Sequence, residues 1–134
     1  MIITESKPFG MIKDKLKKTD KISLNACNEC AKLCGTGGEE GLKNMETKLK
    51  EAGFEVVNKL LFAPLCDKDL DKKVMKNLKG NTILVLACDA GFYNIKKLFK
   101  NKKVIPALDT IGLGAFDESG DIKLVRRFEP SPGE

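Results

Sequence analysis

The chain has 134 residues, of which 42% are hydrophobic and 32% are charged. This length fits one domain with a packed core over residues 1–134, which excludes a large multidomain enzyme. The hydrophobic content excludes an intrinsically disordered protein. The chain carries 24 basic and 19 acidic residues, a net charge of +5, and no His. Catalytic or metal-binding arrangements that depend on an imidazole are therefore excluded for this chain alone.

The N-terminal half of the chain predicts helices and a strand in alternation. Residues 1–20 are expected to hold a short amphipathic helix behind Pro8, because apolar residues recur there at helical spacing. A strand is predicted over residues 21–26, and a loop rich in Cys and Gly follows it. The next helix is expected to begin near Gly38 and to end at Gly53. The apolar positions of these two helices are Phe9, Ile12 and Leu16, then Leu42, Met45, Leu49 and Ala52.

The C-terminal half continues the same alternation. Strands are predicted over residues 54–62, 82–87 and 103–106, and two helices separate them. Asp67 is the expected N-cap of the first helix, which Gly80 ends. Residues 117–134 are expected to form a turn between two short strands and an irregular tail. The apolar positions of the two helices are Leu70, Val74 and Leu78, then Phe92, Ile95, Leu98 and Phe99.

This order of elements predicts the fold class. Strands that alternate with helices are typical of a doubly wound, three-layer α/β sandwich, and we expect a mostly parallel sheet of about four strands. The segment 82–87 is almost continuously apolar, as strands of a parallel sheet are when helices cover both faces.

The basic residues do not point to nucleic acid. Only Arg126 and Arg127 are Arg, there is one Tyr and no Trp, and the Lys residues are scattered over predicted helix surfaces. Solvated helix surface is the leading explanation of the positive charge. An acidic protein partner explains the excess better than DNA does. No apolar run is long enough to cross a bilayer, and the N-terminus has no secretory signal pattern, so we expect a cytoplasmic protein that does not bind membranes.

The five cysteines follow the predicted strands. One comes after the strand 21–26, one after 54–62 and one after 82–87, and two more lie in the Cys-rich loop. Parallel strands end at one edge of a sheet, where α/β folds place their sites, so we expect this loop at the carboxyl edge. Burial as small apolar residues is the alternative, and it is strongest for Cys88. The cysteines are Cys27, Cys30, Cys34, Cys66 and Cys88.

Clustered thiols in a reducing compartment indicate a metal site more than a disulfide framework. Only one Cys-x-x-Cys pair is present, so a [4Fe-4S] cluster ranks first, a [2Fe-2S] cluster second and zinc third. Cys27, Cys30, Cys34 and Cys66 are the expected ligands, and Cys88 is the weakest candidate. We expect Gly35, Gly37 and Gly38 to wrap the backbone around such a group. An ordinary strand-to-helix turn is the alternative for these glycines.

The segment 27–40, CNECAKLCGTGGEE, resembles the hallmark of the methylenetetrahydrofolate reductase C-terminal-domain family. Later segments resemble its further motifs in the same order, and the resemblance covers roughly residues 1–116. They are residues 64–67 (PLCD), 85–91 (VLACDAG) and 106–110 (PALDT).

The resemblance implies an iron-sulfur subunit that passes electrons to a flavin-containing methylenetetrahydrofolate reductase or a similar redox protein. It implies that all five cysteines are candidate ligands and that the chain is not catalytic by itself. Longer members of the family continue into a second Cys-rich segment, whereas no cysteine follows Cys88 here. A zinc-stabilised interaction module and a thiol redox protein using Cys27 and Cys30 remain alternatives.

Asp109 and Thr110 form the last candidate site. They follow the predicted strand 103–106, and we expect them to contact a bound ligand or a partner. Turn formation and helix capping are the alternative explanation for acidic residues just beyond strand ends.

Overall fold

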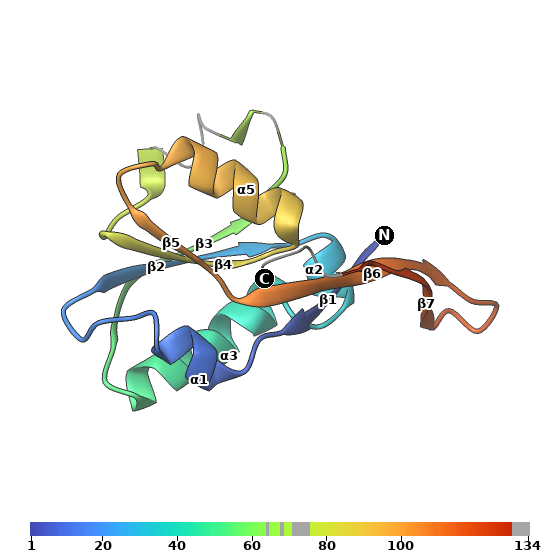
Figure 1. The fold of residues 1–134 in the computed structure, drawn as a ribbon, viewed down its shortest axis with the longest axis horizontal. Coiled ribbons are helices and arrows are strands. Elements are labelled where there is room, and N and C mark those ends of the chain that lie inside the picture. The colour runs from blue at the N-terminus through green and yellow to red at the C-terminus, as the bar shows by residue number, and fades with distance from the viewer. Residues whose placement is uncertain (64, 68, 71–75, 130–134) are drawn as a thin grey trace.

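The computed structural model describes residues 1–63, 65–67, 69–70 and 76–129, and their strands form two sheets (Figure 1). The larger sheet is parallel, with its strands in the order β3 (Glu55–Phe62), β2 (Lys21–Cys27), β4 (Thr82–Leu86) and β5 (Lys103–Pro106). The smaller sheet is antiparallel, in the order β1 (Ile2–Ser6), β6 (Leu108–Phe116) and β7 (Ile122–Arg127). The helices whose bounds are defined are α1 (Phe9–Lys13), α2 (Cys30–Leu33), α3 (Gly38–Glu51) and α5 (Asp89–Leu98).

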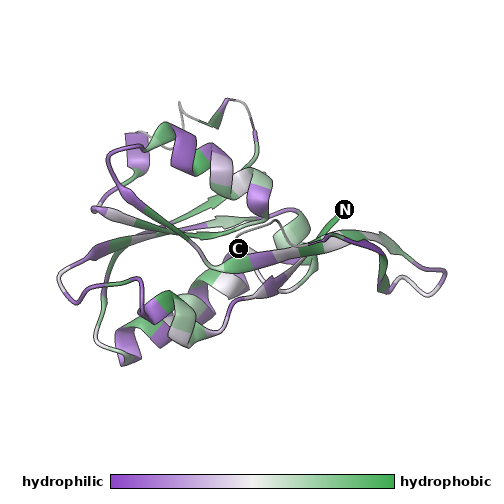
Figure 2. Ribbon diagram, viewed as in Figure 1, coloured by the Kyte–Doolittle hydropathy of each residue, from purple (hydrophilic) through white to green (hydrophobic). Residues whose placement is uncertain are grey.

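The two central strands of the parallel sheet form the core. Every residue of β4 is buried, and so is every residue of β2 after Lys21. Ile22, Leu24 and Leu84 have no exposed surface at all. Figure 2 shows this concentration of hydrophobic residues in the central strands. The predicted parallel sheet of about four strands is thus confirmed, because only strands covered on both faces bury consecutive residues in this way.

Helices cover both faces of the parallel sheet. Figure 1 shows α5 on one face and α1 and α3 on the other, which gives the three layers of an α/β sandwich. The helix α5 packs so closely that a Cβ added at Gly91 would lie 2.8 Å from the Cβ of Ala87. On the other face, α3 buries Leu42, Met45 and Leu49, as their spacing predicts.

The N-terminal region differs from the prediction, whereas the turn between two strands predicted in the tail is confirmed. Residues 1–20 begin with β1, and α1 spans only five residues, so Leu16 lies outside the helix. The tail contains the regular strand β7, which pairs with β6 around the predicted turn. The antiparallel sheet is not predicted because β1 pairs with β6, which lies at the far end of the chain.

Two further differences concern helices. Cys30–Leu33 forms the short helix α2 inside what the sequence suggests is a loop. The predicted helix with apolar positions Leu70, Val74 and Leu78 runs through residues outside the described ones, Val74 among them. No helix among the described residues has the length and apolar character needed to cross a membrane.

Asp20 joins the start of β2 to β5. Its carboxylate is buried and accepts hydrogen bonds from the Lys17 backbone N–H at 2.8 Å and from the Lys103 ammonium group. Lys103 also donates to the backbone carbonyl of Lys15 at 3.0 Å. Burial alone would raise the pKa of Asp20, but the hydrogen bond and charge of Lys103, with the Lys17 N–H, hold it below its ordinary value.

Replacement of Asp20 by Asn is expected to lower the free energy of unfolding at pH 7 by about 1–3 kcal/mol, because the amide lacks the charge that pairs with Lys103. The pKa of Asp20 is lower in the folded chain than in the unfolded chain. Its contribution is therefore complete above the unfolded value of about 3.9 and is lost as the pH falls through the lowered folded value.

Urea unfolding at several pH values checks this prediction. The difference between the wild type and Asp20→Asn should shrink below about pH 4. Asp14→Asn, which changes an exposed carboxylate nearby, is the control and should cost less than about 0.5 kcal/mol. A difference that does not change with pH would contradict the assigned role of the Asp20 charge.

Candidate functional site

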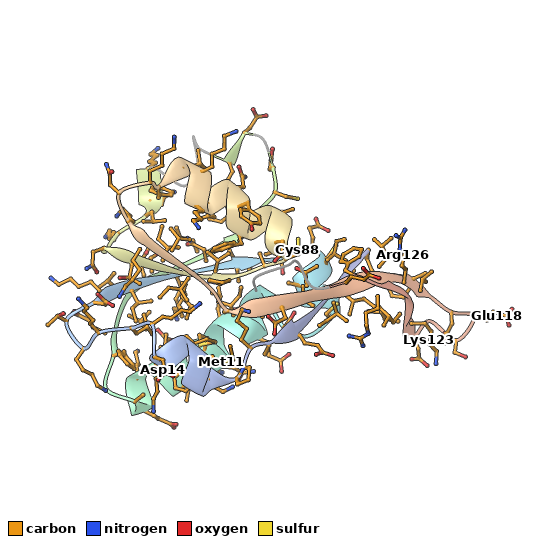
Figure 3. The ribbon with its side chains drawn as sticks, in the orientation of Figure 1. Met11, Asp14, Cys88, Glu118, Lys123 and Arg126 are labelled. Carbon is orange, nitrogen blue, oxygen red and sulfur yellow. The ribbon has the colours of Figure 1, made fainter. Side chains whose placement is uncertain are left out.

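Four cysteines stand at or near the ends of the first three strands of the parallel sheet. Cys27 is the last residue of β2, and Cys30 begins α2 three residues later. Cys66 follows β3, and Cys88 follows β4 and precedes α5 (Figure 3). All are free thiols; Cys27 is buried, Cys30 and Cys88 are half-buried, and Cys66 is exposed.

The pKa of the Cys66 thiol depends on its burial and on three other thiols. Although the residue is exposed, partial burial of its thiol raises its pKa, and the neighbouring Cys88, Cys27 and Cys30 raise it further, in that order. The thiols that act on Cys66 come from two other segments of the chain, which hold the ends of the central strands β2 and β4.

Cys34 has a different environment. Its Sγ lies 3.6 Å from the backbone carbonyl of Ile2, to which it can donate a weak hydrogen bond. The expected ligand set contained Cys34 and ranked Cys88 last. In the structure it is Cys88, rather than Cys34, that acts on the thiol of Cys66.

The gathered thiols do not form a compact metal site as they stand. Among the described residues, no three Cys, Asp or Glu side chains lie close enough to hold a metal ion. A single tetrahedral zinc ion would draw its sulfur ligands to within about 4 Å of one another.

The side chain of Asn94 positions the segment that carries Cys66. From α5, its amide group donates hydrogen bonds to the carbonyls of Leu65, at 2.8 Å, and Asp67, at 3.0 Å. The absence of a side chain at Gly91 lets Leu65 approach α5, because an added Cβ would lie 3.1 Å from that of Leu65. Asn94 therefore anchors the chain on both sides of Cys66, next to the helix that Cys88 precedes.

Contacts with β1 and with the end of β2 hold residues 28–37, here called the Cys-Gly loop, in place. The hydroxyl groups of Thr4 and Thr36 share a hydrogen bond of 2.6 Å, and Thr36 also donates to the carbonyl of Ala31. Gly37 is buried, and a Cβ there would lie 2.6 Å from that of Ala31 and 2.8 Å from the carbonyl oxygen of Cys27. Only glycine allows the loop to pass this close to the end of β2.

The glycines and the Asp-Thr pair that the sequence offers as candidate binding residues line two different pockets. Gly35, Gly37 and Gly38 line one of about 590 Å³ at the start of α3. Asp109 and Thr110 line another of about 550 Å³.

Both residues of the Asp-Thr pair have structural partners. Lys7 forms an ion pair with Asp109, and the Thr110 hydroxyl accepts a hydrogen bond from the backbone N–H of Asp89 at 2.9 Å. The pair therefore ties β6 to the start of α5.

The sequence analysis does not identify Thr4, Thr36 or Asn94. The only signal for Thr4 is the β-branched run that begins at Ile2, which is typical of a strand. Nothing in the helical pattern around Asn94 marks it out, because its partners are backbone carbonyls of a distant segment.

Comparison of the chain with models of protein families, with curated proteins and with solved structures finds no match in any of the three. The interpretation of the site therefore depends on its own side chains.

Replacement of Asn94 by Ala is expected to lower the free energy of unfolding by about 1–3 kcal/mol, because the carbonyls of Leu65 and Asp67 lose their donor. It should also speed alkylation of Cys66, whose segment would be less restrained. Urea unfolding and mass spectrometry of the alkylated protein measure the two effects. Asn44→Ala, on the exposed side of α3, is the matched control, and equal effects of the two substitutions would contradict the role of Asn94.

Alkylation also tests the proximity of the thiols. In the metal-free, reduced protein, the rate at Cys66 should reach half its maximum at a pH above the value of about 8.5 for a free cysteine, because its raised pKa delays thiolate formation. Cys88→Ser should lower this midpoint by removing a neighbouring negative charge. Cys34→Ser should leave it unchanged, and equal shifts in the two variants would show that Cys88 is not the nearer thiol.

Proposed function

We propose that the chain binds a [4Fe-4S] cluster through Cys27, Cys30, Cys66 and Cys88 and serves as an electron-transfer or assembly subunit of an oxidoreductase. The observation that carries this proposal is the position of the cysteines: Cys27 ends β2, which pairs in parallel with β3 and β4, and Cys66 and Cys88 follow those two strands. The raised pKa of Cys66, to which other thiols contribute, agrees with this placement. Four thiols match the usual ligand number of such a cluster. The Cys-Gly loop would then lie at the carboxyl edge of the parallel sheet, where α/β folds place their sites.

The ligand types favour a cluster over a single ion. With no His, the cysteines are the chain's soft ligands, and structural zinc sites usually pair two Cys-x-x-Cys motifs, whereas this chain has one. A [2Fe-2S] cluster and zinc remain the outcomes that metal analysis would distinguish.

The chain itself supplies the ligands and their support. Asn94 holds the Cys66 segment against α5, and Gly37 lets the loop approach the end of β2. The ligands must lose their protons on binding, and the raised pKa of Cys66 makes this loss costlier near neutral pH. Loading should therefore become stronger as the pH rises. When bound, the cluster would supply one-electron transfer.

The resemblance to the methylenetetrahydrofolate reductase C-terminal-domain family supports the same role. It suggests a flavin-containing methylenetetrahydrofolate reductase, or another redox protein, as the partner. With no His in the chain, the common acid-base and nucleophilic arrangements are missing, and an accessory role fits this composition.

Metal and sulfide analysis of protein purified without oxygen tests the proposal. About four irons and four sulfides per chain are expected, with visible absorption that bleaches on reduction. Stoichiometric zinc without colour would overturn the cluster and indicate a zinc-stabilised module. Absence of any metal would leave thiol chemistry as the function of these cysteines.

Cysteine variants then identify the ligands. Cys66→Ser and Cys88→Ser should each lose most of the iron, whereas Cys34→Ser should retain it, because the Cys34 thiol lies against Ile2. All three change the same atom, so they serve as controls for one another. Loss of iron in Cys34→Ser with retention in Cys88→Ser would contradict the ligand set.

A further inference from the structure

The antiparallel sheet ends in a hairpin that projects from the rest of the molecule. Figure 1 shows β6 and β7 extending beyond the helices and the parallel sheet. Within the described part of the chain, β7 pairs with β6 alone, so its other edge carries backbone N–H and C=O groups without a strand partner. Five of its six residues are exposed. An exposed edge strand is a ready template for another strand.

The hairpin is also unusually apolar for an exposed structure. Figure 2 shows that hydrophobic residues continue along it. Nine large hydrophobic side chains are exposed among the described residues, and five of them belong to β6, β7 or the residue after β7. Val125, at 68%, is the most exposed of the nine. Apolar patches of this kind on a soluble protein are typical of interaction surfaces. The five are Leu113, Phe116, Leu124, Val125 and Phe128.

The register of the hairpin places two basic residues of β7 on one face. A β-bulge skips Val125, so that Arg126 pairs with Leu113 and Lys123 pairs with Ala115. Leu113 and Ala115 are two residues apart on β6, so both basic partners stand on one face.

The other face is mainly apolar. Leu124 pairs with Gly114 and Ile122 pairs with Phe116, and these two β6 positions alternate with Leu113 and Ala115. Arg127 pairs with Gly112 and therefore stands on this face as well. Along the edge, β7 thus presents one face with Lys123 and Arg126 and another with Ile122, Leu124 and Arg127.

The charges on β7 are available to a partner. The only two Arg residues of the chain are Arg126 and Arg127, and neither has an ion-pair partner among the described residues. Lys123 has only a loose contact with Asp117, at 3.8 Å. Figure 3 shows Lys123 and Arg126 on the projecting hairpin. Arg is enriched in protein interfaces, where its guanidinium binds carboxylates through two parallel hydrogen bonds.

Two other kinds of partner, a second copy of this chain and a nucleic acid, fit the free edge of β7 less well. Pairing of β7 with the β7 of a second copy would bring the basic side chains of both copies together, which is unfavourable. A nucleic acid would meet the acidic turn at the tip of the hairpin, formed by Asp117, Glu118 and Asp121, beside the basic strand. A protein segment that carries carboxylates avoids both conflicts.

We infer that β7 is a docking edge for an extended segment of a partner protein in which acidic and apolar residues alternate. The segment adds to the sheet as a fourth strand, with its backbone bonded to the free edge of β7. Its carboxylates face Lys123 and Arg126, and its apolar side chains face Ile122 and Leu124. This inference does not depend on the metal.

Titration of the full-length, isotope-labelled chain with two model peptides tests the inference. One peptide of about ten residues alternates Val and Glu, and the other alternates Val and Lys. The Val-Glu peptide should shift the NMR signals of the β7 amides and slow their hydrogen exchange, while β4 stays unchanged. The Val-Lys peptide should do neither.

Charge reversal makes the test specific. Lys123→Glu/Arg126→Glu should weaken binding of the Val-Glu peptide at least tenfold and create binding of the Val-Lys peptide. Lys13→Glu/Lys97→Glu makes the same change of net charge at exposed positions away from the hairpin and should leave binding unchanged. Retained β7 signals in the free variant show that the hairpin is still folded.

Several results would overturn the inference. They are equal binding of both peptides, an absence of any change at β7, a dimer in sedimentation that the β7 charge reversal abolishes, or shifts at β7 caused more strongly by a single-stranded oligonucleotide. Iron content is measured in the same samples, so that failure of the docking edge is distinguished from failure of the cluster.

Discussion

The pairing of β2 with two parallel neighbours is the interaction on which the rest of the structure depends. β2 lies between β3 and β4, and the register places the carboxyl ends of the three strands side by side. The strands are held by main-chain hydrogen bonds and by side chains with no exposed surface, such as Leu24 and Leu84. Cys27 ends β2, and Cys66 and Cys88 come after β3 and β4 in the chain.

The antiparallel sheet connects this region to the outer surface of the molecule. Its strand β1 contacts the Cys-Gly loop through the hydroxyls of Thr4 and Thr36, and its strand β7 forms the projecting edge. Thr110, on β6, accepts a hydrogen bond from the first residue of α5, directly after Cys88. One small sheet thus touches two of the three segments that carry thiols and also presents the surface proposed for docking. A partner bound at β7 would sit on an element that is packed against the proposed metal centre.

The composition of the chain leaves thiols as its principal reactive groups. Without His, acid-base chemistry and metal ligation that depend on an imidazole are missing, and the carboxylate of the candidate Asp-Thr site has a structural partner. Asp109 pairs with Lys7. Burial and neighbouring thiols raise the pKa of Cys66, so its thiol loses a proton less readily near neutral pH. Such a thiol suits a ligand that gives up its proton to a metal better than it suits rapid thiol exchange.

The sequence by itself determined the parallel sheet and the helices α3 and α5, because apolar periodicity reports local burial. The apolar run 82–87 indicates a strand covered on both faces, and the spacing of Leu42, Met45 and Leu49 indicates one side of a helix. Tertiary structure alone decided that β1 pairs with β6, that Asn94 holds the Cys66 segment, and that Cys88 rather than Cys34 acts on Cys66. Each of these contacts joins segments far apart in the chain and involves backbone carbonyls, edge pairing or thiol proximity. Such contacts leave no periodic signature in the sequence.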